Sequence, residues 1–476
     1  MEILKELSKE GKKGYRLSVL DVPEKRLNQL IPEKFLRKEK PGIPEISEPE
    51  VVRHFVNLSI LNHHVDKGFY PLGSCTMKYN PKINEEISRL SSFTNLHPLQ
   101  DDETVQGALQ LMYELQEMLG KVTGFNYVSL QPAAGAHGEL TGLLIMSAYH
   151  KKKGRKKSKI LIPDSAHGTN PASATRAGFV SVKIPSNEEG ILTPQILKEH
   201  LDDDVAGLMI TNPNTLGIFE EYIKDISDLL HSKDALLYMD GANMNALMGY
   251  FRPGDAGIDI LHLNLHKTFS APHGGGGPGA GGVCVQDKLE EFLPVPRIVK
   301  RERFYLDWEY PYSIGKVISF FGNFNVLIKS YVYLKIMGYD GLKEATEQSV
   351  INANYLLKKL KDYYDLPYKR RCMHEFVLSG ERFKKFGVKT LDIAKRLLDF
   401  GFHAPTVYFP LIVSEALMIE PTETESKDTL DRFVEKMIQI SKEAETNPEL
   451  LKEAPKNTPV RRLNEAQAAR DLNVRW

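Results

Sequence analysis

Two residues that could do chemistry stand where apolar strands end. The apolar stretch Ile260–Leu265 leads to Lys267, and the apolar stretch Ala235–Met239 leads to Asp240. A buried ammonium without a partner is costly, but a lysine can form a Schiff base, which removes the charge and creates an electrophilic centre. A carboxylate at the carboxyl end of a strand can pair with a protonated pyridine nitrogen. Together, Lys267 and Asp240 predict a site for pyridoxal phosphate (PLP).

Each of these residues has a simpler interpretation when it is taken alone. Lys267 would then extend its stem along apolar surface to reach water, and Asp240 would be a buried cap of the next helix. The glycine-rich stretch His273–Gly282, directly after the lysine, favours the cofactor interpretation. That stretch has no Gly-Lys-Ser/Thr ending and precedes a strand, which excludes a nucleotide-binding loop. We expect it to let a neighbouring backbone come close or to close over the site.

Three further segments end at the same predicted sheet edge. His167 follows the strand 159–163 and could stack on the flat face of the ring, although a lone histidine is more often a cap or a core residue. Thr169 beside it could reach the ring hydroxyl or a substrate carboxylate. Thr215 belongs to a stretch of hydroxyl and amide donors after another strand, and Ala242 keeps bulk away from the ring. We therefore count these residues with the site.

The segment Gly68–Pro81 is predicted to be a loop because of its glycine and proline content. It also carries Ser74, Cys75 and Thr76, and loops with such side chains often line a site. A surface turn is the alternative. Cys75 is better explained as a small packing residue than as a nucleophile or redox residue, because no nearby residue in the sequence would lower its pKa.

Short apolar strands alternate with helices through the middle of the chain. This pattern predicts an α/β fold with a mostly parallel sheet that is covered on both faces. Residues 340 to about 445 predict a second, smaller α/β domain. We expect an extended N-terminal arm, a large domain, a small C-terminal domain with a bridging helix, and a tail: residues 1–60, 61–310, 311–455 and 456–476.

Composition excludes several classes of protein. The 476 residues include 62 basic and 62 acidic side chains, so no overall field attracts nucleic acid or an anionic membrane, and the basic run Lys151–Lys157 is expected to be a solvated connection. No apolar stretch is long enough to span a membrane. The three cysteines are far apart and show no metal-ligand spacing. With a charged N-terminus unlike a signal peptide, this predicts a cytoplasmic protein.

Several motifs, spread from about residue 60 to 430, resemble the glycine-cleavage P-protein family, glycine dehydrogenase (decarboxylating). The length is similar to that of the separate second subunit of the two-subunit bacterial form. We see no departure from the family pattern at Lys267, Asp240 or His167. The motifs that carry the resemblance are Pro71–Pro81, Asp164–Ser173, Asp240–Ala246, Leu263–Phe269, Pro272–Gly279 and Glu420–Glu425.

The resemblance implies a fold, an activity and partners. The fold would be that of the PLP-dependent aminotransferase-like enzymes (fold type I). The chain would decarboxylate glycine with PLP, release CO2 and transfer the aminomethyl group to the lipoyl arm of the H-protein. Lys267, His167 and Asp240 would be the catalytic residues. The chain would pair with a first P-protein subunit in a two-plus-two heterotetramer.

The resemblance also suggests contacts of lower weight. Gly135 and Ala136 would hold the cofactor phosphate through their amides, since small residues at the start of a helix admit an anion, with help from His266 or Thr268. Predicted substrate contacts are Ser74, Thr76, Asn95 and Thr169.

Two alternatives remain. One is another PLP reaction on the same fold, such as that of a desulfurase or an amino-acid decarboxylase, and the Ser74 loop and the segment Glu420–Thr422 argue against it. The other is a scaffold subunit that has lost its cofactor, against which Lys267 and Asp240 argue.

Overall fold

The structure is a computed structural model that describes residues 2–272 and 277–472. The chain forms two compact units: Met1–Lys67 together with Thr458–Trp476, and Gly68–Asn457. The sequence placed the corresponding boundaries at about 60 and 456. Among the described residues no helix has both the length and the apolar character to cross a bilayer.

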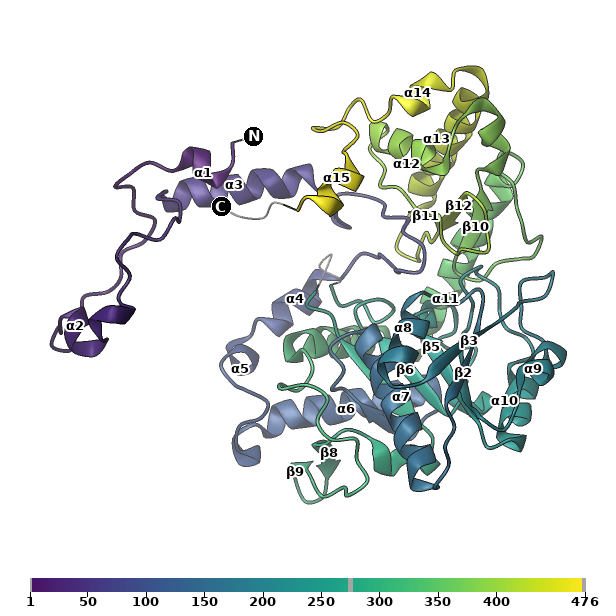
Figure 1. Ribbon diagram of the computed structural model, residues 1–476, viewed down its shortest axis with the longest axis horizontal. Helices are drawn as coiled ribbons and strands as arrows, with labels where there is room; N and C mark the ends of the chain where they lie inside the picture. The colour runs from purple at the N-terminus through teal and green to yellow at the C-terminus, as the bar shows by residue number, and fades with distance from the viewer. Residues whose placement is uncertain (1, 273–276, 473–476) are drawn as a thin grey trace. The chain divides into compact units, whose positions relative to one another are not determined.

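A seven-stranded sheet forms the centre of the larger unit (Figure 1). Its strand order is β1-β7-β6-β5-β4-β2-β3, in which β7 runs antiparallel to β6 and β1 while the remaining neighbours are parallel. The predicted mostly parallel α/β sheet is therefore confirmed. Its strands are β1 (Tyr127–Ser129), β2 (Lys159–Pro163), β3 (Val180–Ile184), β4 (Val205–Thr211), β5 (Leu236–Gly241), β6 (Ile260–Asn264) and β7 (Gly281–Val285).

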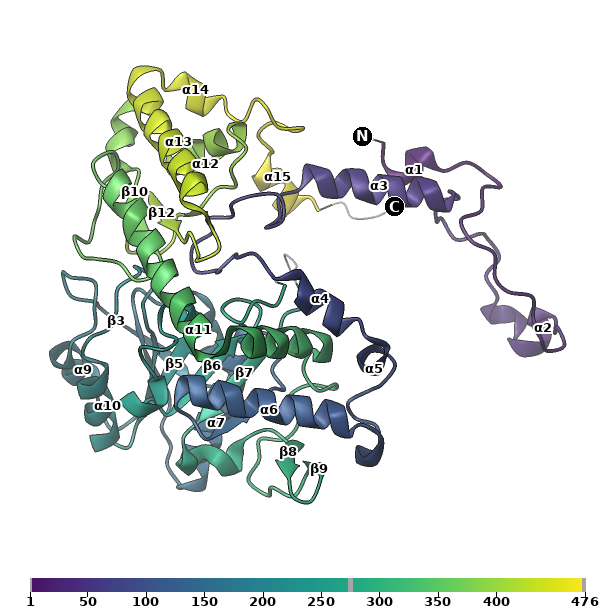
Figure 2. The same cartoon turned by 180° about the vertical axis from the view of Figure 1, so that it is seen from behind.

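Helices cover both faces of this sheet because successive strand residues point to opposite sides. Ile160 and Ile162 of β2 join one core, while Leu161 between them joins the other. Figure 1 shows α7 (Gly135–Lys152) and α8 (Thr169–Arg176) on one face. Figure 2 shows α6 and α11 on the reverse face. Helix α6 spans Gln106–Thr123, and α11 spans Phe324–Leu360 and lies on this face with its start. The other helices on this face are α4 (Lys82–Ser88), α5 (Ser91–Thr94), α9 (Pro194–His200) and α10 (Ile223–Ser232).

A three-stranded antiparallel sheet supports the second core. Its order is β10-β12-β11, with β10 (Phe376–Ser379), β12 (Ala416–Ile419) and β11 (Thr406–Val407). The long helix α11 belongs to both cores, since Leu327 packs in the large core and Leu356 in the small one. The helix is broken by a kink at Gly338, where φ is 58°. The remaining elements are α12 (Thr390–Asp399), α13 (Lys427–Thr446), α14 (Glu449–Lys452) and an unpredicted hairpin of β8 (Arg297–Lys300) and β9 (Phe304–Asp307).

The smaller unit contains a 14-residue helix where the sequence suggested an extended arm. Helix α3 (Glu48–Leu61) begins with a capping box, in which the backbone N–H and the hydroxyl of Ser47 both donate to Glu50. Pro49 is tolerated because it lies in the first turn. The capping box therefore supports a helix in this segment even with Pro49 in its first turn. The other helices of this unit are α1 (Leu4–Leu7), α2 (Leu27–Leu30) and α15 (Glu465–Arg470).

Candidate active site

The sheet places Asp240 and Lys267 on neighbouring strands. Asp240 lies near the end of β5, where its register partners are Thr211 on β4 and His262 on β6. Lys267 lies in the turn that follows β6 and is half-buried. Because β5 and β6 are parallel, both residues belong to the carboxyl edge of the sheet, where ligands of such folds bind.

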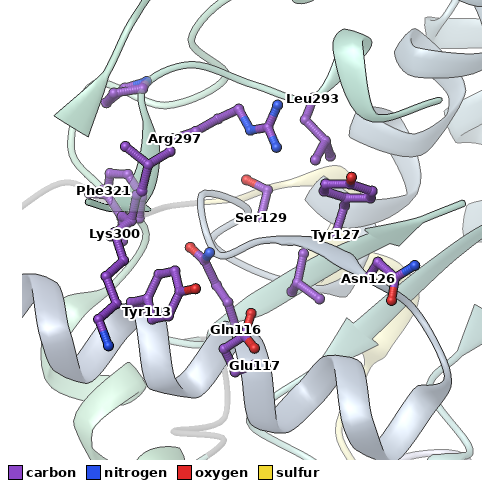
Figure 3. Close-up of a pocket in the computed structure, with 14 residues that line it drawn as sticks. Tyr113, Gln116, Glu117, Asn126, Tyr127, Ser129, Leu293, Arg297, Lys300 and Phe321 are labelled. Carbon is purple, nitrogen blue, oxygen red and sulfur yellow. The ribbon is translucent and has the colours of Figure 1, made fainter. Parts of the chain in front are cut away.

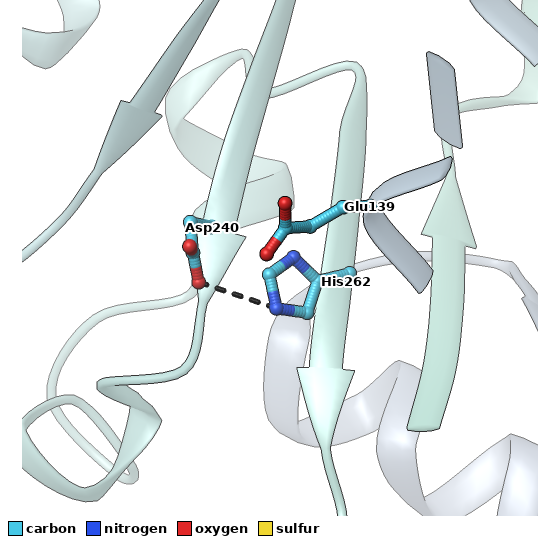
Figure 4. A group of neighbouring side chains, drawn as sticks. All are labelled: Glu139, Asp240 and His262. Atoms are coloured by element: carbon cyan, nitrogen blue, oxygen red, sulfur yellow. Dashed lines mark ion pairs between the residues drawn. The ribbon is translucent and has the colours of Figure 1, made fainter. Parts of the chain in front are cut away.

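Asp240 is buried, and Figure 4 shows it beside His262. The Oδ1 of Asp240 accepts from the backbone N–H of Ala242 at 2.9 Å, and its Oδ2 accepts from the side-chain amide of Asn170 at 3.2 Å. The Nε2 of His262 lies 3.2 Å from Oδ1. Burial alone would raise the pKa of Asp240, but His262, the Ala242 amide and the charge of Lys267 outweigh it, so the pKa is lowered. The site therefore keeps a negative charge at this edge.

His262 is held from both sides of its ring. Its Nδ1 lies 2.5 Å from the hydroxyl of Tyr238, and its Nε2 also lies 2.9 Å from the Asn264 side-chain oxygen. Figure 4 shows Glu139, which comes from α7, beside the same ring. Glu139 accepts from the hydroxyl of Thr169 at 2.8 Å. This support fixes the ring that faces Asp240, a detail that sequence reasoning missed although His262 stands within an apolar strand.

His167 approaches the same charges from the loop after β2. Burial lowers the pKa of His167. The charge of Asp240 raises this pKa and the charge of Lys267 lowers it, each by less than burial does. Its Nδ1 lies 3.1 Å from the Thr169 hydroxyl, and its ring is 5.2 Å from the Phe409 ring. A neutral, flat ring at this edge is suited to stacking on an aromatic ligand.

Lys267 contacts the polar loop that the sequence singled out. Its Nζ donates to the backbone carbonyl of Ser74 at 2.7 Å. Ser74 and Thr76 are buried and have positive φ angles of 62° and 45°. Such angles are strained for residues other than glycine. The loop is thus buried against the lysine and is not the surface turn considered as an alternative. Burial raises the pKa of Cys75 between them to about 11, which keeps this thiol protonated at neutral pH.

The start of α7 offers backbone donors near Lys267. Helix α7 begins at Gly135, and the first amides of a helix have no partner within it. A Cβ at Gly135 would lie 2.2 Å from the Asn264 amide nitrogen, so only glycine allows this approach. His266, placed by the same turn as Lys267, has its Nδ1 3.0 Å from the Ala280 carbonyl. The hydroxyl of Thr268 is buried without a hydrogen-bond partner among the described residues.

The remaining predicted residues differ in their surroundings. Ala242 adjoins Asp240, as the hydrogen bond above shows. Thr215 is buried, and its hydroxyl donates to the carbonyl of Ser165. Asn95 is exposed and follows the short helix α5, so the structure does not bring it to the Lys267 cluster by any hydrogen bond described. The predicted loop residues 273–276 lie outside the described part of the chain.

The residues present fit PLP by their chemistry. Asp240 supplies an anion for a pyridinium, Lys267 supplies an amine, and the start of α7 supplies donors for a phosphate. Buried polar atoms without partners among the described residues also lie beside this cluster, and these need a partner such as water or a ligand. They are the side-chain oxygens of Asn170, Thr211 and Thr268.

Three buried residues next to this cluster were not predicted. Glu375 and Glu420 accept hydrogen bonds from the Ser74–Thr76 loop, and His374 lies beside both carboxylates. The sequence contained a signal, because two acidic residues flank apolar strands of the small domain. The motif that contains Glu420 carried part of the family resemblance, but it did not indicate a contact with the Ser74 loop.

A cavity of about 260 Å³ lies elsewhere in the larger unit (Figure 3). Residues of α6, β1 and β8 line it, including Tyr113, Ser129 and Arg297. Arg297 also pairs with Glu290 at 2.8 Å. None of the predicted site residues lines this cavity, so it is separate from the Lys267 cluster.

Comparison with known proteins agrees with the resemblance seen in the motifs. The family described as "Glycine cleavage system P-protein" matches residues 13–302, which is more than half of the chain. The chain belongs to this P-protein family. A second family, "Glycine dehydrogenase, C-terminal domain", matches residues 345–461. The family resemblance predicted from the sequence is therefore confirmed.

Relatives of the P-protein family align with nearly the whole chain. A "Probable glycine dehydrogenase (decarboxylating) subunit 2" from Caldanaerobacter subterraneus subsp. tengcongensis is 61% identical, covering 99% of this chain and 98% of its own. The protein of the same name from Chloroherpeton thalassium is 59% identical, covering 99% of this chain and 97% of its own. The chain thus corresponds to the separate second subunit of the P-protein.

Solved structures share the fold. A crystal structure of a glycine decarboxylase (P-protein) of the glycine cleavage system superposes with a TM-score of 0.74 at 20% identity, covering 87% of this chain and 94% of that one. A glutamate decarboxylase from Lactobacillus brevis superposes with a TM-score of 0.67 at 15% identity, covering 87% and 96%. At such identities the likeness concerns the fold, which is fold type I of the PLP-dependent enzymes.

Proposed function

We propose that this chain carries the PLP site of a two-subunit glycine dehydrogenase, decarboxylates glycine and transfers the aminomethyl group to the lipoyl arm of the H-protein. The observation that carries the proposal is the cluster of Lys267, Asp240 and His167 at one sheet edge in a P-protein family member. Family membership selects the reaction, and the cluster supplies the groups that the reaction needs.

Each residue of the cluster has a part in binding. The amine of Lys267 would bind the cofactor carbonyl, the Asp240 carboxylate would pair with the ring nitrogen, and the His167 ring would stack on the ring face. Gly135 and Ala136 at the start of α7 would hold the phosphate, with His266, Thr268, Thr215 and Ala242 around the ring. When bound, PLP supplies an electron sink for the electron pair that remains as CO2 leaves.

The surrounding residues can control protons and water. Lys267 Nζ would hold a proton near the reacting carbon, and its hydrogen bond to the Ser74 carbonyl supports this role. The buried Ser74 and Thr76 exclude water from this side of the lysine, which favours loss of a carboxylate as neutral CO2. Ser74, Thr76 and Thr169 are the proposed contacts to glycine, and the exposed Asn95 is not kept among them.

Two observations support a separate first subunit as the partner of this chain: the name of the relatives and the exposed apolar residues of helix α3. The relatives' name, subunit 2, supports a separate first subunit, and we expect a two-plus-two heterotetramer. Helix α3 supports this because it exposes a series of large apolar side chains, a composition typical of a buried interface. The cytoplasm fits three free cysteines. The exposed apolar residues of α3 are Val52, Phe55, Val56, Leu58, Ile60 and Leu61.

The test uses the chain assembled with the first subunit. We expect bound PLP to produce an absorbance band at about 420 nm that Lys267→Ala abolishes, since the covalent link between the cofactor and the protein needs the Lys267 amine. Lys224→Ala is the control, because Lys224 is an exposed lysine of α10 that pairs only with Asp228 among the described residues. A wild-type protein without the band would instead be a scaffold subunit.

The reaction is tested by isotope exchange. Labelled bicarbonate should enter glycine in the presence of the first subunit and lipoylated H-protein, and this exchange should be lost in Lys267→Ala. Turnover of cysteine or glutamate in place of glycine would contradict the proposed substrate and favour another PLP reaction.

A further inference from the structure

Two carboxylates of the small sheet face each other at one end of antiparallel strands. Phe376 of β10 pairs with Ile419 of β12, so Glu375 and Glu420 are the next residues on the two strands. Both side chains are fully buried. One oxygen from each carboxylate and a ring nitrogen of His374 lie within 4.8 Å of one another. Like charges in such positions repel strongly.

His374 cannot neutralise this pair. Burial, together with the charge of Lys267, lowers the pKa of His374 to about 3. Both its ring nitrogens lack hydrogen-bond partners among the described residues, and Nε2 lies 3.9 Å from each carboxylate. Burial and the neighbouring carboxylate therefore raise the pKa of Glu375, and burial raises that of Glu420. A single shared proton relieves the repulsion.

The hydrogen bonds identify the carboxyl that keeps the charge. Glu420 accepts from the Thr76 hydroxyl at 2.6 Å, the Thr76 amide at 2.9 Å and the Cys75 amide at 3.2 Å. Glu375 accepts from the backbone N–H of Ser74 at 2.6 Å and from the side-chain amide of Asn243 at 3.3 Å. Since more donors favour the ionised form, Glu420 is the anion and Glu375 carries the proton.

The same hydrogen bonds fix the loop that contacts Lys267. Consecutive amides of Ser74, Cys75 and Thr76 point at the two carboxyls, while the Ser74 carbonyl accepts from Lys267 Nζ. Ser74 and Thr76 have left-handed backbone angles that an external anchor must maintain. The carboxyl pair provides that anchor.

We propose that the pair of Glu375 and Glu420 holds one proton, carried by Glu375, and acts as a positioning pair, which holds the Ser74 carbonyl against the Lys267 amine. The inference rests on the proposed role of Lys267 for its link to catalysis. Neither glutamate contacts the lysine by a hydrogen bond described here, so both act on it through the loop and through their charge. The described titratable groups that face the pair are Lys267, His374 and the two thiols of Cys75 and Cys372.

The shared proton is tested by infrared spectroscopy on the full chain assembled with the first subunit and PLP. A carboxamide reproduces the donor and acceptor of a neutral carboxyl but not an anion. The difference spectrum between wild type and Glu375→Gln at neutral pH should contain the carbonyl band of one protonated carboxyl group. Absence of this band would overturn the shared proton.

The positioning role is tested by the pH titration of the cofactor absorbance, recorded without glycine. Glu420→Gln removes the anion and should shift the titration midpoint and lower kcat on the order of 10- to 100-fold. Glu375→Gln should shift the midpoint less, because it removes no charge. Equal shifts in the two variants, or none in either, would overturn the proposal.

Controls separate folding and the proposed function from the positioning role. Glu220→Gln also removes a buried carboxyl, whose pKa burial raises to about 7, but Glu220 bonds to Asn214 and the Leu192 amide and not to the loop. It should leave the midpoint unchanged. If Glu420→Gln does not fold, Thr76→Val removes one donor to Glu420 and should shift the midpoint in the same direction. If the wild-type protein shows no cofactor band, both the proposed function and the positioning role are contradicted. The infrared spectrum alone then tests whether the carboxyl pair holds a proton.

Discussion

Two buried clusters of this chain have the same composition but opposite electrostatics. Each contains one histidine and two carboxylates: Glu139, Asp240 and His262 on the large sheet, and His374, Glu375 and Glu420 on the small one. In the first, the pKa of the aspartate is lowered, while in the second the pKa values of both glutamates are raised.

The difference lies in what holds each histidine. The ring of His262 has partners on both nitrogens, with Tyr238 on Nδ1 and Asp240 beside Nε2. His374 has no hydrogen-bond partner among the described residues and faces two carboxylates at 3.9 Å. A supported histidine can stabilise a neighbouring anion, whereas an unsupported, buried one stays neutral. Composition alone therefore does not determine whether a buried cluster holds a charge or a proton.

The largest expected effect comes from removing the anion of the first cluster. We expect Asp240→Asn to lower kcat/KM by about 10²- to 10⁴-fold, because removing one partner of a buried pair costs about 3–5 kcal/mol. The measurements are glycine turnover and the intensity of the cofactor band.

Asp259→Asn is the matched control for that variant. Asp259 is equally buried, pairs with His231 at 2.8 Å and precedes β6 at the amino edge of the same sheet. It should lose stability but keep the cofactor spectrum. A similar loss of turnover in both variants would show that burial of a charge, and not its place at the carboxyl edge, determines the effect.

A smaller effect is expected from the support of His262. Tyr238→Phe leaves Nδ1 of His262 without its partner, which should destabilise the fold by about 1–3 kcal/mol and weaken PLP retention. Tyr364→Phe is the control, since Tyr364 is fully buried and donates to the Met437 carbonyl in the small core. Urea unfolding and PLP release are the measurements. Equal PLP release from both variants would contradict the supporting role of Tyr238.

The smallest effect is a difference in pH dependence between the clusters. The lowered pKa of Asp240 contributes stability above its ordinary value of 3.8 that is lost as the pH falls through the folded value. The raised pKa of Glu375 contributes stability that is present below its ordinary value of 4.5 and is lost as the pH rises.

These signs predict opposite trends in two variants. The destabilisation by Asp240→Asn should shrink toward low pH, while Glu375→Gln should gain stability relative to wild type as the pH rises. Since one pKa unit corresponds to about 1.4 kcal/mol, we expect differences on the order of 1 kcal/mol. Urea unfolding at about pH 3, 4, 6 and 8 measures them, because the contribution of Asp240 is lost only below its ordinary pKa of 3.8. Parallel trends in the two variants would mean that the clusters do not differ in charge.

The sequence was sufficient to predict the sheet and the elements that carry the proposed site. Alternating apolar strands and helices predicted a parallel sheet, and the places of Asp240 and Lys267 after successive strands predicted their proximity. These predictions depend on local periodicity and on a general rule about strand ends. The loop with Ser74 was also singled out from its composition, although not its contact with Lys267.

Other features depend on contacts that local patterns do not contain. The meeting of Glu375 and Glu420 requires the pairing of β10 with β12, and their contact with Ser74 requires the small sheet to approach the large one. Similarly, the ring of His262 is fixed by Tyr238 across two strands. Helix α3 is different, because the residues of its capping box, Ser47 and Glu50, are close in the sequence and could have indicated a helix there.

The hydrogen bonds of the Ser74–Thr76 loop have a consequence for synthesis of the protein. Ser74 is separated from Glu375 by 301 residues, and Thr76 from Glu420 by 344. During translation the large sheet can therefore be complete while its lysine-facing loop still lacks both anchors. Contacts of such long range form late. Lys267 would thus gain its fixed neighbour only after Glu420 has left the ribosome, which delays completion of the proposed site until the chain is nearly finished.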